Sequence, residues 1–349
     1  MRVIWLSSKD LGNSLSSTTI IELANGLVRK GHEVTVYSPG NPKNVLFTHN
    51  QVERSKTRGF QSRSLVKALK KRTAEFDKAE VVLIDWPIFK LAKYIPCPVI
   101  LMDRSPPADS GILAQLQWPI WFKAWKKAER GTAVSDMHAD AIRTFSEPNP
   151  ITEKIAVIPA GVDLDKFKPS QKEGALKLAY IGKVDVNRGV MSLAMILSGL
   201  HEVGVDATMH IHGSGDAIEK LRNINLKGME ITDALPQEEL AERISSYDVG
   251  FLTMPDDNVW SMASPLKRSE YLASGMIICG IDHDGHRQKD SEEFSKLFKE
   301  EEFISRSVNW LRKLSRDELS TMQNSARKYA EENLSWDYSV DVLDSMIRE

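Results

Sequence analysis

Residues 159–177 read PAGVDLDKFKPSQKEGALK, and this stretch separates two similar halves of the chain. It holds two prolines, two glycines and seven charged residues, which is the composition of a linker between domains. On both sides of it, short apolar runs alternate with amphipathic helical patterns. Such alternation predicts a parallel sheet with helices on both faces. The sequence therefore predicts two doubly wound α/β domains joined by a hinge.

The predicted strands are short apolar runs, five in each half. They cover residues 3–6, 33–37, 81–84, 99–102, 132–134, 178–181, 208–212, 229–231, 249–253 and 276–279. We assign residues 1–160 to the first domain, 161–177 to the hinge and 178–335 to the second domain. The last helix, 336–349, is expected to pack back on the first domain. Ligands of α/β proteins bind at the carboxyl ends of the strands, so a cleft is expected between the two domains.

Composition excludes several classes of protein. No stretch approaches the ~20 apolar residues of a membrane span, and the apolar start, residues 1–6, has no cleavage-site pattern. Two cysteines far apart fit neither a disulfide framework nor a zinc site, so a reducing cytoplasm is expected. Residues 1–165 carry 23 Lys and Arg against 17 Asp and Glu, and the remainder carries 23 against 31. Either the first half faces an anionic partner, or the difference in net surface charge between the two domains has no function.

Three loops in the second half follow predicted strands and carry polar residues. The first, Gly182 to Gly189, reads GKVDVNRG and offers two cations, Lys183 and Arg188. Lys and Arg at a strand end can clamp a pyrophosphate and stabilise charge on a departing phosphate. The alternative is a pair of solvated loop cations. The second loop, residues 212–215, reads HGSG; its glycines allow a ligand to approach the backbone, although an ordinary tight turn would need them too.

The third loop opens the segment SPLKRSEYLASG, residues 264–275. Ser264 is predicted as the N-cap and Pro265 as the first helical residue. The free backbone N–H groups of Leu266 and Lys267 would then favour a phosphate. Glu270 follows one turn later, where a carboxylate can accept hydrogen bonds from ribose hydroxyls. The alternative is an exposed helix glutamate paired with Lys267.

In this order and spacing, the motifs resemble those of glycosyltransferase family 4, which has the two-domain GT-B fold. Residues 155–167, IAVIPAGVDLDKF, are similar to the family's hinge signature, with Ala160 where Asn is usual. GKVDVNRG resembles its G-R-x-x-x-x-K-G loop with the two cations exchanged, SPLKRSEYLASG its donor-site helix, and LSWDYSV its closing aromatic helix. The resemblance implies an α/β chain of two Rossmann-like domains facing each other across a cleft.

The resemblance also implies a retaining, hexosyltransferase-like enzyme that moves a sugar from a nucleotide-diphospho-sugar donor, such as a UDP- or GDP-sugar, to an acceptor. It implies no cofactor and no metal ion, because Lys183 and Arg188 would neutralise the leaving diphosphate. The donor-binding residues that it implies are Gly12, Gly182, Gly213, Gly215, Ser264, Leu266, Lys267 and Glu270.

Two positions depart from the family pattern. Met262 stands where a second glutamate often contacts the donor sugar, and Asp103 and Arg104 follow the strand at 99–102, where the family tends to place His. We assign Asp103 to the sugar site. The departures leave two alternatives: a GT-B nucleotide-sugar-binding subunit with reduced catalysis, and a nucleotide-sugar epimerase or phosphorylase on the same fold. A pyridoxal-phosphate phosphorylase would need a longer chain, and no additional acid/base pair for an epimerase is evident.

Two segments of the first half suggest an anionic membrane surface. Residues 54–72 contain eight basic residues and no acid, and residues 117–127, QWPIWFKAWKK, place four aromatic side chains beside three lysines. Cations with aromatics suit such an interface, so we expect peripheral association with the cytoplasmic membrane face and a lipid-linked acceptor. The alternatives are aromatic packing between helices, and a basic loop that is solvated or binds a phosphorylated soluble acceptor. No nucleic-acid-binding module accompanies the charge.

Overall fold

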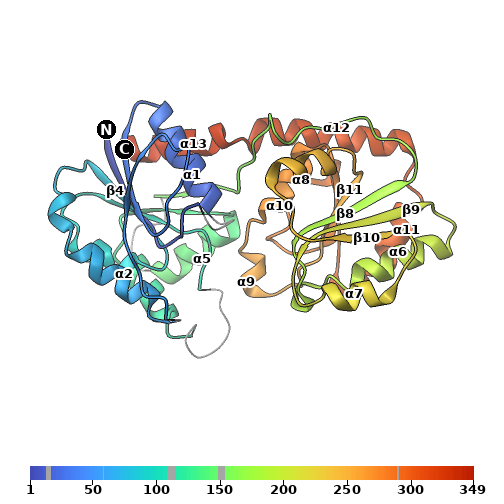
Figure 1. Cartoon of the computed structure of the whole chain (residues 1–349), viewed down its shortest axis with the longest axis horizontal. Coiled ribbons are helices and arrows are strands. Elements are labelled where there is room, and N and C mark those ends of the chain that lie inside the picture. Colours follow the sequence, from blue (N-terminus) through green and yellow to red (C-terminus); the bar gives the residue numbers. More distant parts are fainter. Residues whose placement is uncertain (13–16, 58, 108–114, 148–153, 289–290) are drawn as a thin grey trace. The chain divides into compact units, whose positions relative to one another are not determined.

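The chain forms two compact units. The computed structural model describes residues 1–349 apart from 13–16, 58, 108–114, 148–153 and 289–290. The first unit contains Met1–Pro159 and Trp336–Glu349, and the second contains Ala160–Ser335 (Figure 1). The boundary lies one residue from the end of the first domain assigned above. The stretch at 161–177 belongs to the second unit, whose first strand already begins at Leu176.

The first unit is built on a seven-stranded parallel sheet. The strands are β1 (Arg2–Leu6), β2 (Glu33–Ser38), β3 (Thr48–Gln51), β4 (Val81–Asp85), β5 (Val99–Met102), β6 (Arg130–Ala133) and β7 (Ile155–Val157), in the order β3-β2-β1-β4-β5-β6-β7. The five buried strands expected from their apolar runs are present. The edge strands β3 and β7 were not predicted, since β3, THNQ, is polar and mostly exposed and β7 has only three residues.

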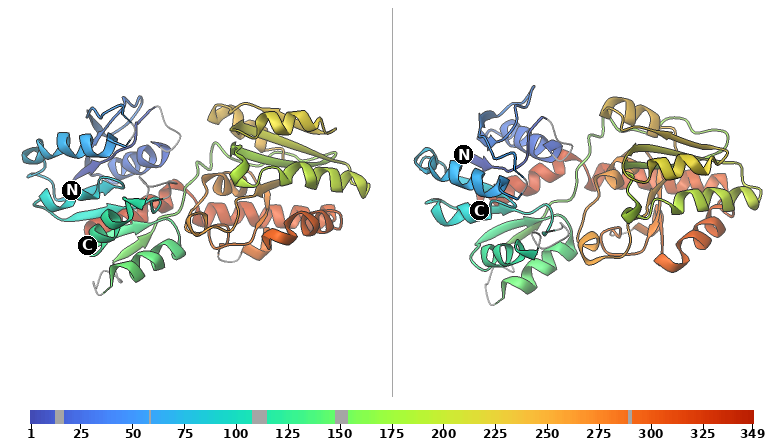
Figure 2. Two further views of the ribbon diagram at one scale, coloured as in Figure 1. Left: turned by 90° about the horizontal axis from the view of Figure 1, so that it is seen from below. Right: turned by 60° about the horizontal axis from the view of Figure 1, so that its bottom comes forward.

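Helices cover both faces of this sheet (Figure 2). They are α1 (Thr18–Arg29), α2 (Gln61–Lys70), η2 (Thr73–Glu75), η3 (Phe89–Tyr94), α4 (Trp118–Trp125), α5 (Asp136–Ser146) and α13 (Trp336–Arg348). The last of these lies beside α1 (Figure 1). Gly26 permits this contact, because a Cβ there would come within 2.2 Å of the Val340 side chain. Arg130 also donates a hydrogen bond to the carbonyl of Met346 at 2.8 Å.

The second unit repeats the plan with a six-stranded parallel sheet. Its strands are β8 (Leu176–Lys183), β9 (Ala207–Ser214), β10 (Met229–Thr232), β11 (Val249–Leu252), β12 (Ile277–Ile281) and β13 (Ser295–Phe298), in the order β10-β9-β8-β11-β12-β13. Its helices are η5 (Val186–Arg188), α6 (Ser192–Glu202), α7 (Ile218–Ile224), α8 (Gln237–Ile244), α9 (Asn258–Ser261), α10 (Leu266–Ala273), η6 (Ser291–Glu293), η7 (Glu300–Glu302), α11 (Phe303–Leu311) and α12 (Arg316–Asn333).

Alternate residues of β8 enter two separate cores, one on each face of the sheet. Leu178 and Tyr180 pack with α6, α7 and α11, whereas Ala179 and Ile181 pack with α8, α10 and α12. A side chain of the size of Leu stabilises by about 1.5–3 kcal/mol when it is fully buried. Burial on both faces explains why the strands are continuous apolar runs and confirms the predicted doubly wound class.

Candidate functional site

The strand order of the second sheet reverses between β8 and β11, and these two strands part early. They pair only at Leu178 with Val249 and at Ala179 with Gly250. Beyond that point the N–H of Ile181 donates to the Tyr271 hydroxyl at 2.9 Å, so a side chain of α10 takes the place of a strand partner. In open α/β sheets, ligands bind at such a reversal, outside the carboxyl ends of the strands. The candidate site is therefore built from the segments that follow β8, β11 and α9.

The end of β8 and the loop that follows it, residues 182–189, are fixed to the end of β11. Gly189 adopts a φ of +70°, and a Cβ there would lie 2.3 Å from the carbonyl oxygen of Thr253, so only glycine fits. The Thr253 hydroxyl donates to the carbonyl of Arg188 at 2.6 Å. Gly182 has a φ of +105°. The two glycines of the GKVDVNRG motif are thus explained by the turn itself.

The two cations of this loop differ in how they are held. The Arg188 guanidinium lies 3.7 Å from the Asp185 carboxylate and 4.6 Å from the centre of the Trp260 ring, and it donates to the Met254 sulfur at 3.6 Å. Lys183 is exposed and makes no side-chain hydrogen bond or ion pair with the residues that the structure describes. Arg188 is therefore positioned before any ligand arrives, whereas Lys183 is free to move.

Helix α10 begins one residue later than predicted. Pro265 is its N-cap, and Leu266 is the first helical residue. The Ser264 hydroxyl caps nothing: it accepts hydrogen bonds from the Ala160 backbone and from Arg268, both at 3.2 Å. The prediction of Ser264 as N-cap is wrong, because these tertiary donors take its oxygen. As the first two helical residues, Leu266 and Lys267 have backbone N–H groups with no partner inside the helix.

Glu270 lies one turn into α10 and is 7% exposed. The alternative of an exposed glutamate paired with Lys267 is therefore wrong. Burial raises the pKa of Glu270 to about 7, and the charge of Lys267 opposes the shift. The Lys267 ammonium lies 3.6 Å from the centre of the Tyr180 ring, and no ion pair joins it to Glu270. The structure thus brings Lys267, Glu270 and the loop of Arg188 together, since both charges act on the pKa of Lys267.

The glycines of the HGSG loop are required by the sheet. A Cβ at Gly213 would lie 1.8 Å from the carbonyl oxygen of Gly182, and one at Gly215 would lie 2.2 Å from that of Val184. Close approach of β9 to β8 therefore accounts for both residues without a ligand. In the first unit, Gly12 follows β1 in the loop that bridges to Gly40, with a φ of +92°. Its predicted place beside the donor stays a prediction.

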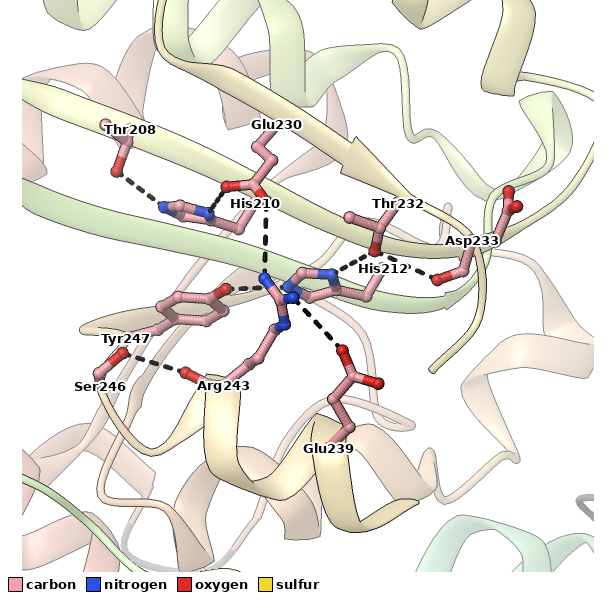
Figure 3. A network of polar contacts seen from close by, with 10 residues as sticks. All are labelled: Thr208, His210, His212, Glu230, Thr232, Asp233, Glu239, Arg243, Ser246 and Tyr247. Atoms are coloured by element: carbon pink, nitrogen blue, oxygen red, sulfur yellow. Dashed lines mark hydrogen bonds and ion pairs between the residues drawn. The ribbon is translucent and has the colours of Figure 1, made fainter. Parts of the chain in front are cut away.

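His212 belongs to a polar network between β9, β10 and α8 (Figure 3). Its ring bonds to the Thr232 hydroxyl at 2.7 Å and to the Tyr247 hydroxyl at 2.9 Å, and His210 stacks on Tyr247 at 4.5 Å. Burial lowers the pKa of His212 to about 4, helped by His210. A neutral imidazole with both nitrogens occupied supports the sheet edge, and sequence spacing alone gave no sign of this network.

Asp103 is not available to a ligand. Its side chain has no exposed surface. The carboxylate accepts hydrogen bonds from the indole of Trp121 at 2.5 Å and of Trp125 at 3.2 Å, and His138 lies 3.5 Å away. The assignment of Asp103 to the sugar site is wrong, because the carboxylate is buried where α4 and α5 pack on the sheet and accepts hydrogen bonds from the indoles of α4.

The same contacts correct the aromatic part of the predicted membrane surface. Trp121 and Trp125 are fully buried in the first unit's core, and Trp118 and Phe122 are half-buried. Three of the basic residues, Arg63, Lys67 and Lys70, lie on α2 and are exposed, whereas its Leu65 and Leu69 are buried in the core. Of the eight basic residues in 54–72, Arg58 lies outside the described residues.

Among the described residues, no helix is long and apolar enough to cross a bilayer, and no three potential metal-ligating side chains lie together.

Comparisons with known proteins agree with this fold. Residues 16–166 match the sequence model of Glycosyltransferase Family 4. No curated protein sequence is significantly similar to the chain. Sucrose-phosphate synthase from Thermosynechococcus elongatus is similar in structure at 14% identity and a TM-score of 0.79, over 99% of this chain and 98% of that one. WaaG, a glycosyltransferase involved in lipopolysaccharide biosynthesis, has 14% identity, a TM-score of 0.73 and 99% coverage of both chains. HepE of Anabaena, in complex with UDP and glucose, has 11% identity, a TM-score of 0.73 and 100% coverage of both.

Proposed function

We propose that this protein is a glycosyltransferase, which moves a sugar from a nucleotide-diphospho-sugar to an acceptor with retention at the anomeric carbon. The match of residues 16–166 to Glycosyltransferase Family 4 and the GT-B fold of the whole chain support the proposal. One observation carries the proposal. The gap between β8 and β11 is bordered by the cationic loop at 182–189 and by the free amides that begin α10. Cationic side chains and free backbone N–H groups at a helix start can both bind a diphosphate, and here they lie at the point where the strand order reverses.

The donor's nucleotide is assigned to α10. Glu270, once ionised, accepts hydrogen bonds from two ribose hydroxyls, and the N–H groups of Leu266 and Lys267 donate to phosphate oxygens. HepE was solved with UDP and glucose, so a UDP-sugar is the first donor to test, with a GDP-sugar next. Met262, which is buried, offers no carboxylate to the hydroxyls of the sugar. The proposal therefore assigns no residue of the second unit to recognition of the sugar.

Lys183 and Arg188 are assigned to the leaving group. When the bond between the anomeric carbon and the diphosphate oxygen breaks, negative charge grows on the diphosphate. Fixed cations at that position stabilise the transition state more than the ground state. The positioned guanidinium of Arg188 suits this role, and the mobile Lys183 can close on the phosphates after the donor binds. We assign no metal ion to this step, as the family resemblance implies.

The nucleotide site predicts a specific thermal shift. UDP at 100 times its Kd should stabilise the protein by about 2.7 kcal/mol, which a melting-temperature scan detects. Glu270→Ala should weaken UDP binding roughly 10- to 100-fold, because hydrogen bonds to a carboxylate are lost. Glu219→Ala, on the exposed face of α7, is the matched control and should leave the shift unchanged. Absence of any shift with UDP, GDP and their sugars would remove the support for the proposal.

A non-catalytic subunit is the second candidate, and Met262 is the observation that favours it. A site that binds the nucleotide but lacks the sugar-reading acid can hold a donor without turning it over. Transfer and donor hydrolysis, measured across UDP- and GDP-sugars, separate the two readings. Tight nucleotide binding with no turnover of any donor would favour the subunit.

We also propose that the first unit docks on an anionic membrane through α2, next to a lipid-linked acceptor. Arg63 and Lys67 are exposed on its outer face, one turn apart. Each cation near an anionic surface contributes about 1 kcal/mol, so the Arg63→Glu/Lys67→Glu variant should bind vesicles at least roughly 30-fold more weakly. Co-sedimentation with phosphatidylglycerol vesicles tests this, with phosphatidylcholine vesicles as the control. No binding of the unchanged protein at low salt would defeat the proposal.

A further inference from the structure

The side-chain ammonium of Lys267 has no hydrogen-bond partner, although it is buried. It rests on the face of Tyr180, with Nζ 3.6 Å from the ring centre, and contacts no acceptor among the described residues. A buried cation without an acceptor costs free energy, which the contact with an aromatic ring recovers only in part. A lysine serving stability alone would not be expected in this environment.

Charged side chains act on this ammonium. Burial lowers the pKa of Lys267 to about 7, the like charge of Arg188 adds to the shift, and Glu270 opposes it. On the other side, burial depresses the pKa of His286, and Lys267 and Arg268 contribute to that shift. The phenol of Tyr180 remains protonated, because burial raises its pKa. Lys267 and Arg188 thus share one carboxylate, Glu270, and Asp185 lies 3.7 Å from Arg188.

The backbone around Lys267 also offers a helix start and a glycine. Lys267 begins α10 together with Leu266, so its backbone N–H and its side chain belong to the same anion-binding helix start. Gly182 lies on the other side: a Cβ there would be 3.7 Å from Lys267 Nζ, and glycine leaves that space without a side chain. The four-carbon stem of lysine allows the ammonium to leave the ring for a phosphate oxygen.

We propose that the Lys267 side chain is a third cation of the donor site, which rests on Tyr180 in the free protein and binds the diphosphate of the nucleotide sugar beside Lys183 and Arg188. This rests on the proposed function and adds a group outside the Lys/Arg pair. A diphosphate beside Lys267 favours its charged form and raises its pKa. Between the free and the bound pKa, donor binding therefore takes up a proton, and affinity falls as the pH rises through that window.

Calorimetric titration with UDP and with uridine, in two buffers of different ionisation enthalpy, tests the proposal. At about pH 8 Lys267 is mostly neutral and Glu270 mostly ionised, so UDP should take up close to one proton and uridine almost none. Lys267→Met should bind UDP roughly 10- to 100-fold more weakly, leave uridine affinity unchanged and abolish the uptake. Lys313→Met, at an exposed position, is the matched control.

Melting temperature separates this role from a structural one. Met fills similar space without an unpaired charge, so Lys267→Met should melt at the same or a higher temperature. A structural lysine would instead lower the melting temperature and weaken UDP and uridine alike. Lys267→Gln, which keeps a polar side chain without charge, is measured alongside and should lose the same proton uptake.

The outcomes distinguish the inference from the proposed function. If the unchanged protein binds UDP and both variants bind it as tightly, with the same proton uptake, the third cation is wrong and the nucleotide site stands. If the unchanged protein binds neither UDP nor GDP, the proposed function fails and this inference fails with it. Weaker UDP binding with unchanged uridine binding and a retained melting temperature supports the third cation.

Discussion

Lys183→Ala and Arg188→Ala should each lower the rate of sugar transfer roughly 100- to 1,000-fold, which is the usual effect of removing one preorganised contact to developing charge. The reason is the position of both cations, at the end of β8 and in the loop that follows it, where β8 and β11 part. Arg188 is held by Asp185, Trp260 and Met254, so its charge is in place before the bond breaks. The measurement is single-turnover transfer at a saturating concentration of nucleotide sugar.

Two comparisons sharpen this prediction. Arg188→Lys keeps the charge but loses the planar guanidinium that stacks on Trp260, so it should recover only part of the rate. Lys313→Ala removes an exposed lysine of the same unit and should leave the rate unchanged. Melting temperatures of all variants should stay close to that of the unchanged protein. Rates like those of the unchanged protein in both alanine variants would contradict the assignment of the leaving-group cations.

The fold could be predicted because its signals are local. A strand buried on both faces must be apolar along its length, and the runs that became β1, β4, β8 and β12 show this directly. The order and spacing of the motifs did the same for the GT-B fold, and the GKVDVNRG motif forms a turn that needs its glycines. These glycines, Gly182 and Gly189, are both at positive φ.

The site was less predictable because its side chains make hydrogen bonds and close contacts with residues that are distant in the sequence. Ser264 precedes a helix and looks like a cap, yet it accepts from Ala160, which is far away in sequence. Gly213 looks like a ligand contact, yet the carbonyl of Gly182 occupies the space where a Cβ would lie. The unpartnered ammonium of Lys267 could not be foreseen at all, because it depends on Tyr180 lying beneath α10.

Asp103→Ala should lower the free energy of unfolding of the first unit by about 3–5 kcal/mol while leaving the proposed transfer activity of the folded protein intact. The carboxylate is fully buried and accepts from the indoles of Trp121 and Trp125. His138 Nε2 lies 3.5 Å from it without forming a hydrogen bond, and the Val134 N–H donates to His138 Nδ1. Alanine would leave the two buried indole N–H groups without this acceptor.

Urea unfolding followed by tryptophan fluorescence is the appropriate measurement, because six of the eight tryptophans lie in the first unit. Asp103→Asn retains one acceptor oxygen and should lose less stability than alanine, with a transfer rate within a few-fold of that of the unchanged protein at low temperature. The sugar-site role first assigned to Asp103 makes the opposite prediction: stability close to that of the unchanged protein and a rate that collapses in both variants. The two readings differ because a buried carboxylate that orients two indoles acts on folding, whereas one that contacts a sugar acts on the transition state.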